Sequence, residues 1–599
     1  MTTWRRLGTA LAIVLTAGAL SSAFAQVRPK ISVDGGTVII NRKPAVLFRA
    51  GNGALAPQDR AAITAQRLAD FAASGQDPNS ITAKGDRHQA RVLAGEVLIC
   101  IATAADAKAA RTTPLGLAQS WAQNVKSLLL MPPVVLEPGS PLVPVGENRR
   151  VDIGGAAVGL IYAKVADPEI ATVSTGPDGS YVLVLGRRVG DTTVEISVEG
   201  ERACMPVAVR EYAGRTPDVS LTEVTGNPCP AELVRYAAGQ AIAQNASLQP
   251  GAKIEVGAVE AAGGALGPDR CRRTAVAVSI SGRGYIPFAA QAVVEVRNVS
   301  MARETVDKLF YSNAPERLEK FQTLFAAKLK RDDSTRVLYH HQNAMAKRVQ
   351  LIVELINPGD SPARIRVFRG VSNPRIDTLL VGQIAANEFL RSFHNNVSVI
   401  ESIPAGSRLV LVSDFLDPHK TSSGILQVRQ MSGEDVYVRI TAAEPWVDDV
   451  SEGTIAAAPN PLMLEMSDHI YPSPSKDLDT TYRVGERWAF IPIGKHGVQD
   501  SQQQKQLYGD YGVTYNISVK VENPTSETKK VRVLFDPTAG LASGVFIIDG
   551  RFILTKNAQP PLEVLLASYS LKPGEVRNVS ITTVPLAGSN YPATLVVRS

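Results

Sequence analysis

Two adjacent histidines, His340 and His341, are the residues whose types most directly suggest metal chemistry. Neighbouring imidazoles can bind a metal ion, and His394 or His469 would have to supply a third ligand. Along a β-strand, however, successive side chains point to opposite faces, so the two rings do not converge. We therefore expect one buried and one exposed histidine, and we predict no metal site.

A second candidate is the run Ser467-Asp468-His469, which supplies the residue types of a nucleophile, a carboxylate and a base. A catalytic triad normally draws its members from distant segments, and Ser467 does not lie in a G-x-S-x-G elbow. The sequence also lacks HExxH, a P-loop, and a GxGxxG between a strand and a helix. We predict no catalytic residue, no cofactor and no enzymatic activity.

Three tyrosines, Tyr508, Tyr511 and Tyr515, are candidates for a binding surface. Exposed tyrosines stack on sugars or anchor protein partners. Tyrosines that alternate with β-branched residues are also ordinary strand formers, so a strand core is the alternative.

Four cysteines without a CxxC pair favour disulfides over a zinc site in an oxidising compartment. They allow three pairings. We expect a Cys229–Cys271 bridge, because both residues fall inside one compact segment. The pairing of Cys100 and Cys204 stays open, since they would have to bridge a domain boundary or remain buried thiols.

The first 25 residues read as a signal peptide. Arg5 and Arg6 form a basic start, residues 7–20 are apolar, and Ala23-Phe24-Ala25 offers a cleavage site. No later apolar run approaches the roughly 18 residues that a membrane span needs. We therefore expect export to the periplasm or the cell surface, with no transmembrane segment after cleavage.

The net charge of +6 becomes +4 once Arg5 and Arg6 leave with the signal. A mild positive charge favours anionic neighbours such as cell-wall polymers. Nucleic-acid binders show a clustered basic face, often with aromatic residues between the charges, and here Arg and Lys are spread along the chain. We predict no nucleic-acid partner.

The length of 599 residues predicts several domains, roughly one per 150 residues. Helices should begin at Pro57 and Pro114, and apolar residues at helical spacing from Leu318 to Leu329 predict a further helix. After the signal peptide at 1–25, we expect a small α/β module at 26–131, a β domain at 132–212, an α+β module at 213–299, a helical segment at 300–335, and β-sandwich-like domains at 336–445 and 446–599.

An internal repeat supports two sandwiches in the C-terminal half. Residues 349–367 parallel residues 515–533, each as an alternating strand, Asn-Pro, a polar turn and a second alternating strand. The steps that begin at Ile403-Pro-Ala-Gly406 and Lys572-Pro-Gly-Glu575 repeat in the same way. This half resembles the hairpins of secreted Ig-like domains.

The order VGENRRVDI, VADPEIATVS and YVLVLGRRVGDTTVEISVEG lies within residues 132–212. This segment resembles the N-terminal domain of pilus-assembly secretins and, more loosely, the bacterial Ig-like domain of the invasin/intimin type. Both resemblances imply a structural or adhesive module. No pore-forming segment follows, so we do not expect the chain itself to be the outer-membrane channel.

We predict a multidomain, mainly β protein with Ig-like β-sandwiches in series with small α/β and α+β modules. Its predicted role is a non-enzymatic binding or structural protein of the bacterial cell envelope, in assembly, adhesion or scaffolding. Other envelope proteins or anionic cell-wall polymers are the expected partners. The alternative is an extracytoplasmic carbohydrate- or cell-wall-polymer-binding protein, accessory to an enzyme. Exposed aromatic residues on one face would favour sugars, whereas an unpaired strand edge would favour protein partners.

Overall fold

A computed structural model of the chain describes residues 29–157, 159–259, 263–445 and 450–599. The predicted signal peptide lies outside the described residues. The protein is mainly β, as predicted, and it divides into two compact units. The first unit comprises the chain up to Tyr212 with Gly284–Ile286, and the second comprises Ala213–Arg283 with Pro287–Ser599.

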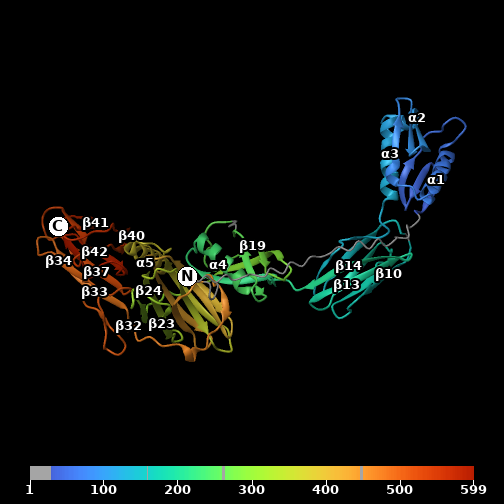
Figure 1. Cartoon of the computed structure of the whole chain (residues 1–599). Coiled ribbons are helices and arrows are strands. Elements are labelled where there is room, and N and C mark those ends of the chain that lie inside the picture. The colour runs from blue at the N-terminus through green and yellow to red at the C-terminus, as the bar shows by residue number, and fades with distance from the viewer. Residues whose placement is uncertain (1–28, 158, 260–262, 446–449) are drawn as a thin grey trace, which may run out of the picture. The chain divides into compact units, whose positions relative to one another are not determined.

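The first unit begins with an α/β module in which two helices pack against two small sheets (Figure 1). Prolines start both long helices, as predicted, because the first helical position needs no backbone N–H. The side chain of Trp121 is buried against Phe48, with ring centroids 5.1 Å apart. The elements are β1 (Ile31–Asp34), β2 (Thr37–Ile40), β3 (Lys43–Leu47), α1 (Pro57–Ala73), β4 (Ile81–Gly85), β5 (Gln89–Ala94), β6 (Val97–Thr103), α2 (Ala104–Ala109) and α3 (Pro114–Leu129).

An Ig-like β-sandwich follows in the same unit. Two four-stranded sheets, in the orders β10-β13-β14-β8 and β11-β12-β9-β7, enclose a core of aliphatic residues. The alternating residues of β12 and β13 supply much of this core, as expected for strands with one buried face. The strands are β7 (Val135–Glu137), β8 (Leu142–Pro144), β9 (Asn148–Gly154), β10 (Ile161–Val165), β11 (Ala171–Thr175), β12 (Tyr181–Gly186), β13 (Gly190–Val198) and β14 (Glu201–Arg210).

The second unit is built on one 11-stranded sheet, which runs across the predicted domain boundary at 299/300. Its main path is β18-β19-β20-β16-β27-β26-β29-β24-β21-β32, and β22 pairs with β24. These strands are β16 (Val219–Thr225), β18 (Lys253–Val256), β19 (Cys271–Ser281), β20 (Phe288–Asn298), β21 (Lys308–Ser312), β22 (Arg317–Leu318), β24 (Ser334–Asn343), β26 (Ala363–Val371), β27 (Ser398–Ile403), β29 (Thr421–Ser432) and β32 (Ile470–Pro472).

The predicted helix within residues 300–335 is wrong. The segment forms β21, β22 and β23 (Gln322–Lys328), which pair with neighbours far along the chain. A β-bulge between Thr323 and Phe325 shifts the alternation of apolar side chains, so their spacing imitates a helical face. Pairing with other strands determines the structure of this segment, because a short helix is only marginally stable unless an apolar face packs against the rest of the protein.

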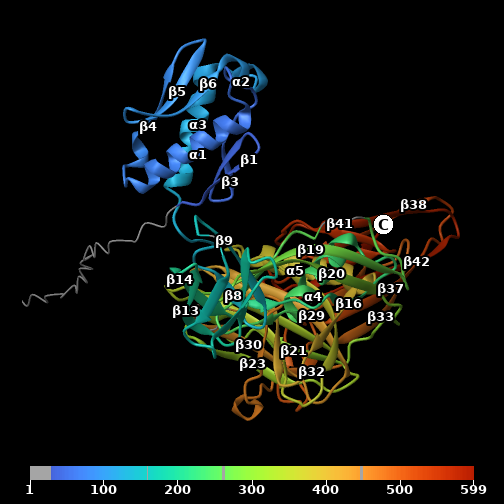
Figure 2. The same ribbon diagram turned by 90° about the vertical axis from the view of Figure 1, so that its right-hand side faces the viewer.

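Different elements cover the two faces of the large sheet. On one face, a five-stranded sheet in the order β23-β30-β25-β28-β31 completes a sandwich with β27, β26, β29 and β24. Beyond that sheet, α4 (Ala231–Asn245) packs on β16 and β20 (Figure 2). On the opposite face, α5 (Thr378–His394) packs on β26 and β29. The remaining strands of the smaller sheet are β25 (Val349–Asn357), β28 (Ser407–Leu416), β30 (Tyr437–Ala443) and β31 (Ile455–Ala457).

The C-terminal residues form a second sandwich of this unit. Its sheets have the orders β33-β37-β42-β39-β40 and β34-β43-β38-β41, and its core continues into the apolar residues under α5, among them Phe389 and Phe368. The strands are β33 (Ser475–Arg483), β34 (Ala489–Ile493), β37 (Thr514–Glu522), β38 (Lys529–Asp536), β39 (Val545–Ile548), β40 (Arg551–Leu554), β41 (Val564–Leu571), β42 (Val576–Thr583) and β43 (Ala593–Arg598).

The internal repeat corresponds to a shared hydrogen-bonded turn. Asn357 and Asn523 end β25 and β37, and both side chains are buried. The Asn357 side-chain nitrogen donates to the carbonyls of Ser361, Ile403 and Pro404. Asn523 donates in the same pattern, to Glu527, Leu571 and Lys572. Each asparagine thus ties its own turn to the end of a distant strand, which explains why the Asn-Pro and Pro-Gly steps recur together.

Candidate functional site

Both histidines of the pair are fully buried, so the expectation of one exposed ring is wrong. His341 bonds Ser312 Oγ and the Pro315 carbonyl, each at 2.9 Å, and therefore serves as a structural link to the segment beside β21. Both ring nitrogens of His340 lack a hydrogen-bond partner, and the Glu316 carboxylate is 4.0 Å away. Burial lowers the pKa of His340 to about 3 and that of His341 to about 4, so both rings are neutral at physiological pH.

The run at residues 467–469 forms no triad geometry. The His469 ring faces its neighbour Asp468, with Nδ1 at 3.2 Å from a carboxylate oxygen. The Ser467 hydroxyl accepts a long contact of 3.4 Å from the His469 backbone N–H, which leaves it without a base that could remove its proton. Across the described residues, no group of three or more His, Cys, Asp or Glu side chains is arranged to hold a metal ion.

Of the three candidate binding tyrosines, two are structural. Tyr515 is buried, donates to Asp510 and accepts from the Gly494 N–H at 2.8 Å. Tyr511 donates to the Ser589 carbonyl at 3.0 Å and packs edge-on against Tyr591. Tyr508 is 74% exposed and is the member of the group that a partner could reach.

The four cysteines are free thiols in this structure, so the predicted Cys229–Cys271 bridge is not formed. Strand alternation gives the reason. Cys229 is buried just before α4, whereas Cys271 shares the exposed face of β19 with Arg273, opposite the buried face that carries Val276. Cys100 and Cys204 are likewise unpaired, the first buried and the second exposed.

A half-buried charged cluster lies where α4 meets the first sandwich of the second unit. Arg369 of β26 donates two hydrogen bonds of 2.5 Å to the Glu452 carboxylate and one to the Tyr236 hydroxyl of α4. Next to it, burial raises the pKa of Glu401, whose carboxylate accepts from Gln244 at 2.9 Å. Tyr236, Arg369 and Glu452 form the inner wall of a cleft of about 790 Å³ between α4 and the end of α5.

Asp414 of β28 adds a second perturbed carboxyl near the same cluster. Burial raises its pKa to about 6, against a hydrogen bond of 2.5 Å from Ser422. Perturbed carboxyls in a cleft are typical of functional sites but also of structural ion-pair networks. Here Arg369 is fully occupied by Glu452 and Tyr236, and the arrangement brings no nucleophile to a base. We therefore interpret the cluster as a structural ion-pair network that joins α4 to the first sandwich.

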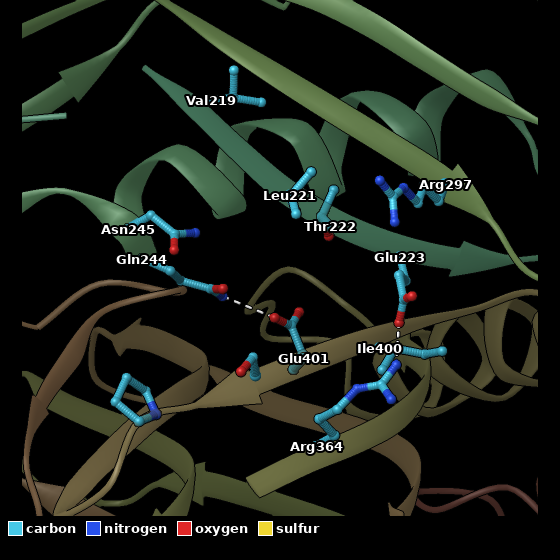
Figure 3. Close-up of a pocket in the computed structure, with 12 residues that line it drawn as sticks. Val219, Leu221, Thr222, Glu223, Gln244, Asn245, Arg297, Arg364, Ile400 and Glu401 are labelled. Atoms are coloured by element: carbon cyan, nitrogen blue, oxygen red, sulfur yellow. Dashed lines mark hydrogen bonds and ion pairs between the residues drawn. The ribbon is translucent and has the colours of Figure 1, made fainter. Parts of the chain in front are cut away.

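A second opening interrupts the large sheet between β16 and β27, and we call it the fork (Figure 3). The two strands pair antiparallel only over Glu223–Thr225 and Ser398–Ile400. Beyond this pairing, residues 219–222 of β16 and residues 401–403 of β27 diverge around a cavity of about 480 Å³. In Figure 3, Glu401 reaches toward Gln244 on one side of the fork, and Glu223 pairs with Arg364 on the other.

No local sequence pattern predicts the fork. The sequence shows the alternation of apolar and polar residues in β16 and β27. Which strands pair, and over how many residues, depends on contacts between segments far apart in the chain. The sequence shows only that the apolar residues Val219 and Leu221 alternate along β16; in the structure they are 43% and 57% exposed, on a strand whose other face is largely buried. None of the described helices is long and apolar enough to cross a membrane.

Comparison with known proteins matches residues 37–130 to a domain of unknown function (DUF8459). This match falls on the α/β module. No curated protein matches the chain. The resemblance of residues 132–212 to the secretin N-terminal domain therefore stays a prediction.

Solved structures of repeated extracellular domains give weak likenesses. Domains 4 and 5 of the S-layer protein SbsC are 22% identical over 13% of this chain and 52% of that chain, with a TM-score of 0.12. The insect immune protein hemolin is 8% identical over 34% of this chain and 63% of that chain, with a TM-score of 0.16. Tandem Ig repeats of Dlar are 13% identical over 28% and 98%, with a TM-score of 0.13. The chain thus matches about half of the SbsC domain structure, and TM-scores this low support no inference about function.

Proposed function

We propose that this protein is an exported, non-enzymatic scaffold of the bacterial cell envelope that works by binding other proteins. The observation that carries the proposal is the fork, where two strands of the large sheet present unpaired edges to solvent beside exposed apolar side chains. Unpaired edges are templates for another chain, and folded proteins usually cover or charge them unless a partner uses them. Side chains that first suggested chemistry, such as His341 and Tyr515, instead form hydrogen bonds within the fold.

Site-directed photocrosslinking in cells tests this proposal. A photoreactive amino acid replaces Leu221 in the fork, and a matched control places it at Leu462, which is 90% exposed and lies outside the fork. We expect a discrete adduct with an envelope protein from position 221 and none of the same size from position 462. Retention of the chain in the cytoplasmic fraction, or identical adducts from both positions, would contradict the proposal.

Binding of a cell-wall polymer is a second candidate, favoured by one observation. Phe490 on edge strand β34 and Trp488 just before this strand are 52% and 46% exposed, and their ring centroids lie 6.2 Å apart. Exposed aromatic rings of this kind stack on sugars. Co-sedimentation with purified peptidoglycan would measure this activity, and the double variant Trp488→Ala/Phe490→Ala should abolish it, while Tyr508→Ala should leave it intact.

A further inference from the structure

The backbone of β16 turns its free hydrogen-bonding groups into the fork. Val299 N–H donates to the Val224 carbonyl at 2.8 Å, so the Val224 peptide groups point toward β20. Backbone direction alternates along a strand, and therefore Val219 and Leu221 direct their N–H and C=O groups away from β20, toward β27. Their pairing partners on β27 would follow the Glu223–Ile400 pair, but the strands have separated by that point.

The opposite edge of the fork has the same property over a shorter length. Ile400 faces β16, so alternation points the backbone of Ser402 into the fork as well, while Glu401 pairs with Ile365 of β26. Pro404 has no N–H and ends this edge. A strand that entered the fork would thus find two backbone positions on one side, Val219 and Leu221, and a single one on the other, Ser402.

The side chains around the fork differ between the two faces of the sheet. On the face that carries α4, Gln244 and Asn245 at the helix end line the cavity together with Glu401, so this side is polar. On the other face, Val219 and Leu221 present exposed apolar surface. An entering strand would therefore need polar side chains on one face and apolar side chains on the other.

Charges on the apolar face favour an acidic residue in the entering strand. Glu295 accepts from both Arg273 and Arg297 at 2.7 Å, and Glu223 pairs with Arg364. Three guanidinium groups thus face two carboxylates, and Arg297 and Arg364 both line the cavity. One further carboxylate would balance this set, and charge complementarity of this kind governs partner choice more than raw affinity.

We propose that the fork binds an extended peptide segment of a partner envelope protein by strand addition, with apolar and acidic side chains on the face that carries Leu221. The inference rests on the proposed function and specifies the chemistry of the partner. Main-chain hydrogen bonds to Val219 and Leu221 supply affinity, and alternate side chains supply specificity, as in other cases of β-augmentation.

Binding of a model peptide to the full mature chain tests the inference. The probe is the blocked heptapeptide TVTDTVT, whose Val and Asp side chains share one face of a strand. One control replaces Asp by Lys, and a second methylates alternate backbone nitrogens of the probe. We expect saturable binding of the probe by fluorescence anisotropy and about tenfold weaker binding of the Lys control, since one reversed charge is worth roughly that factor. The methylated control loses more than one hydrogen bond and should bind more weakly still.

Amide hydrogen exchange and two variants locate the binding. The probe should slow exchange at the amides of Val219, Leu221 and Ser402, which point into the fork. Leu221→Pro removes the N–H that points into the fork without touching the β20 ladder and should weaken binding about tenfold, while Leu221→Val should leave it nearly unchanged. If circular dichroism shows that Leu221→Pro does not fold, Ser402→Pro makes the same test from the opposite edge.

Equal binding of the methylated peptide, or protection elsewhere in the chain, would overturn strand addition. The absence of probe binding would overturn the proposed peptide chemistry as well.

If the crosslink from position 221 persists in cells while the probe fails to bind, the inference is wrong and the proposed function stands. If the crosslink is also absent, both are wrong. A dimer that is lost in Leu221→Pro would show that a second copy, and not a partner peptide, occupies the fork.

Discussion

At the scale of single residues, His340 and Asp414 are two polar groups whose burial makes the stability of the fold depend on pH in opposite directions. His340 is fully buried, has two ring nitrogens without a hydrogen-bond partner, and lies close to Gly588 and the Thr378 carbonyl. Unpartnered buried groups are costly because they lose hydrogen bonds to water without replacement. Asp414 is partly buried and accepts one hydrogen bond, from Ser422; its desolvation disfavours the charged carboxylate.

The low pKa of His340 predicts sensitivity to acid. Its folded-state pKa is about 3, below the ordinary value of 6.5, so the unfolded chain binds more protons between these values. The stabilisation is therefore complete above pH 6.5 and is lost as the pH falls toward 3, at about 1.4 kcal/mol per pH unit at most. His340→Leu should shift the acid-unfolding midpoint, followed by circular dichroism, to lower pH. The exposed His496→Leu serves as the control and should leave the midpoint unchanged.

Asp414 predicts the reverse dependence. Its folded-state pKa of about 6 exceeds the ordinary 3.8, so the folded chain holds the proton longer. This contribution is present below pH 3.8 and is lost as the pH rises through 6. Asp414→Asn keeps an acceptor for Ser422 and should raise the free energy of unfolding in urea at pH 7.5, with little gain at pH 4. A gain of equal size at both pH values would show that ionisation of Asp414 is not the cause.

At the scale of elements, α5 is held by two glycines that permit close approach. A Cβ at Gly370 of β26 would lie 2.3 Å from the Ala385 carbonyl of α5. A Cβ at Gly382 of α5 would lie 1.9 Å from the Ala587 carbonyl of the C-terminal sandwich. The helix is therefore clamped between the large sheet and the second sandwich by backbone contacts that no larger residue allows.

Gly382→Ala should destabilise the second unit, because its methyl group meets a backbone atom that cannot rotate away. Overpacking of this kind costs roughly 1–3 kcal/mol. The matched control is Gly239→Ala in α4, where the nearest side-chain atom is 3.9 Å away and alanine should add about 0.5–1 kcal/mol of stability. Urea unfolding of the two variants measures both effects. Equal stability of the two variants would mean that α5 moves freely against the second sandwich.

The elements also show what the sequence can predict. Local signals were sufficient for the helices that begin at Pro57 and Pro114, and the repeat around Asn357 and Asn523 predicted two sandwiches with equivalent turns. The strands β21 to β23 were missed because a bulge imitates helical spacing. The buried histidines and the fork were missed because strand pairing between distant segments creates them, and no local pattern contains that information.

At the scale of the whole molecule, one sheet joins the regions on either side of the domain boundary predicted at 299/300. Strands of residues 219–298 and 308–472 share the 11-stranded sheet, and Arg366 bonds Glu304, Ser398 and Asn396 where the chain passes between them. A protein built on a shared sheet gains rigidity but loses independent folding of its parts. The fork lies in this sheet, where the α+β strands join the sandwich, so its geometry depends on both regions.

This continuity predicts that residues 213–445 unfold as one cooperative unit. A protease site inserted at 299/300 should resist cleavage in the native protein or, once cut, release no folded fragment, because β16 would lose its pairing with β27. A site inserted at 212/213, at the limit of the first unit, should yield a folded fragment 213–599 with an unchanged urea midpoint. Intrinsic fluorescence and circular dichroism of that fragment should give coincident transitions. A stable, folded 213–299 fragment would show that the shared sheet contributes no cooperativity and that the fork can open by separation of the two regions.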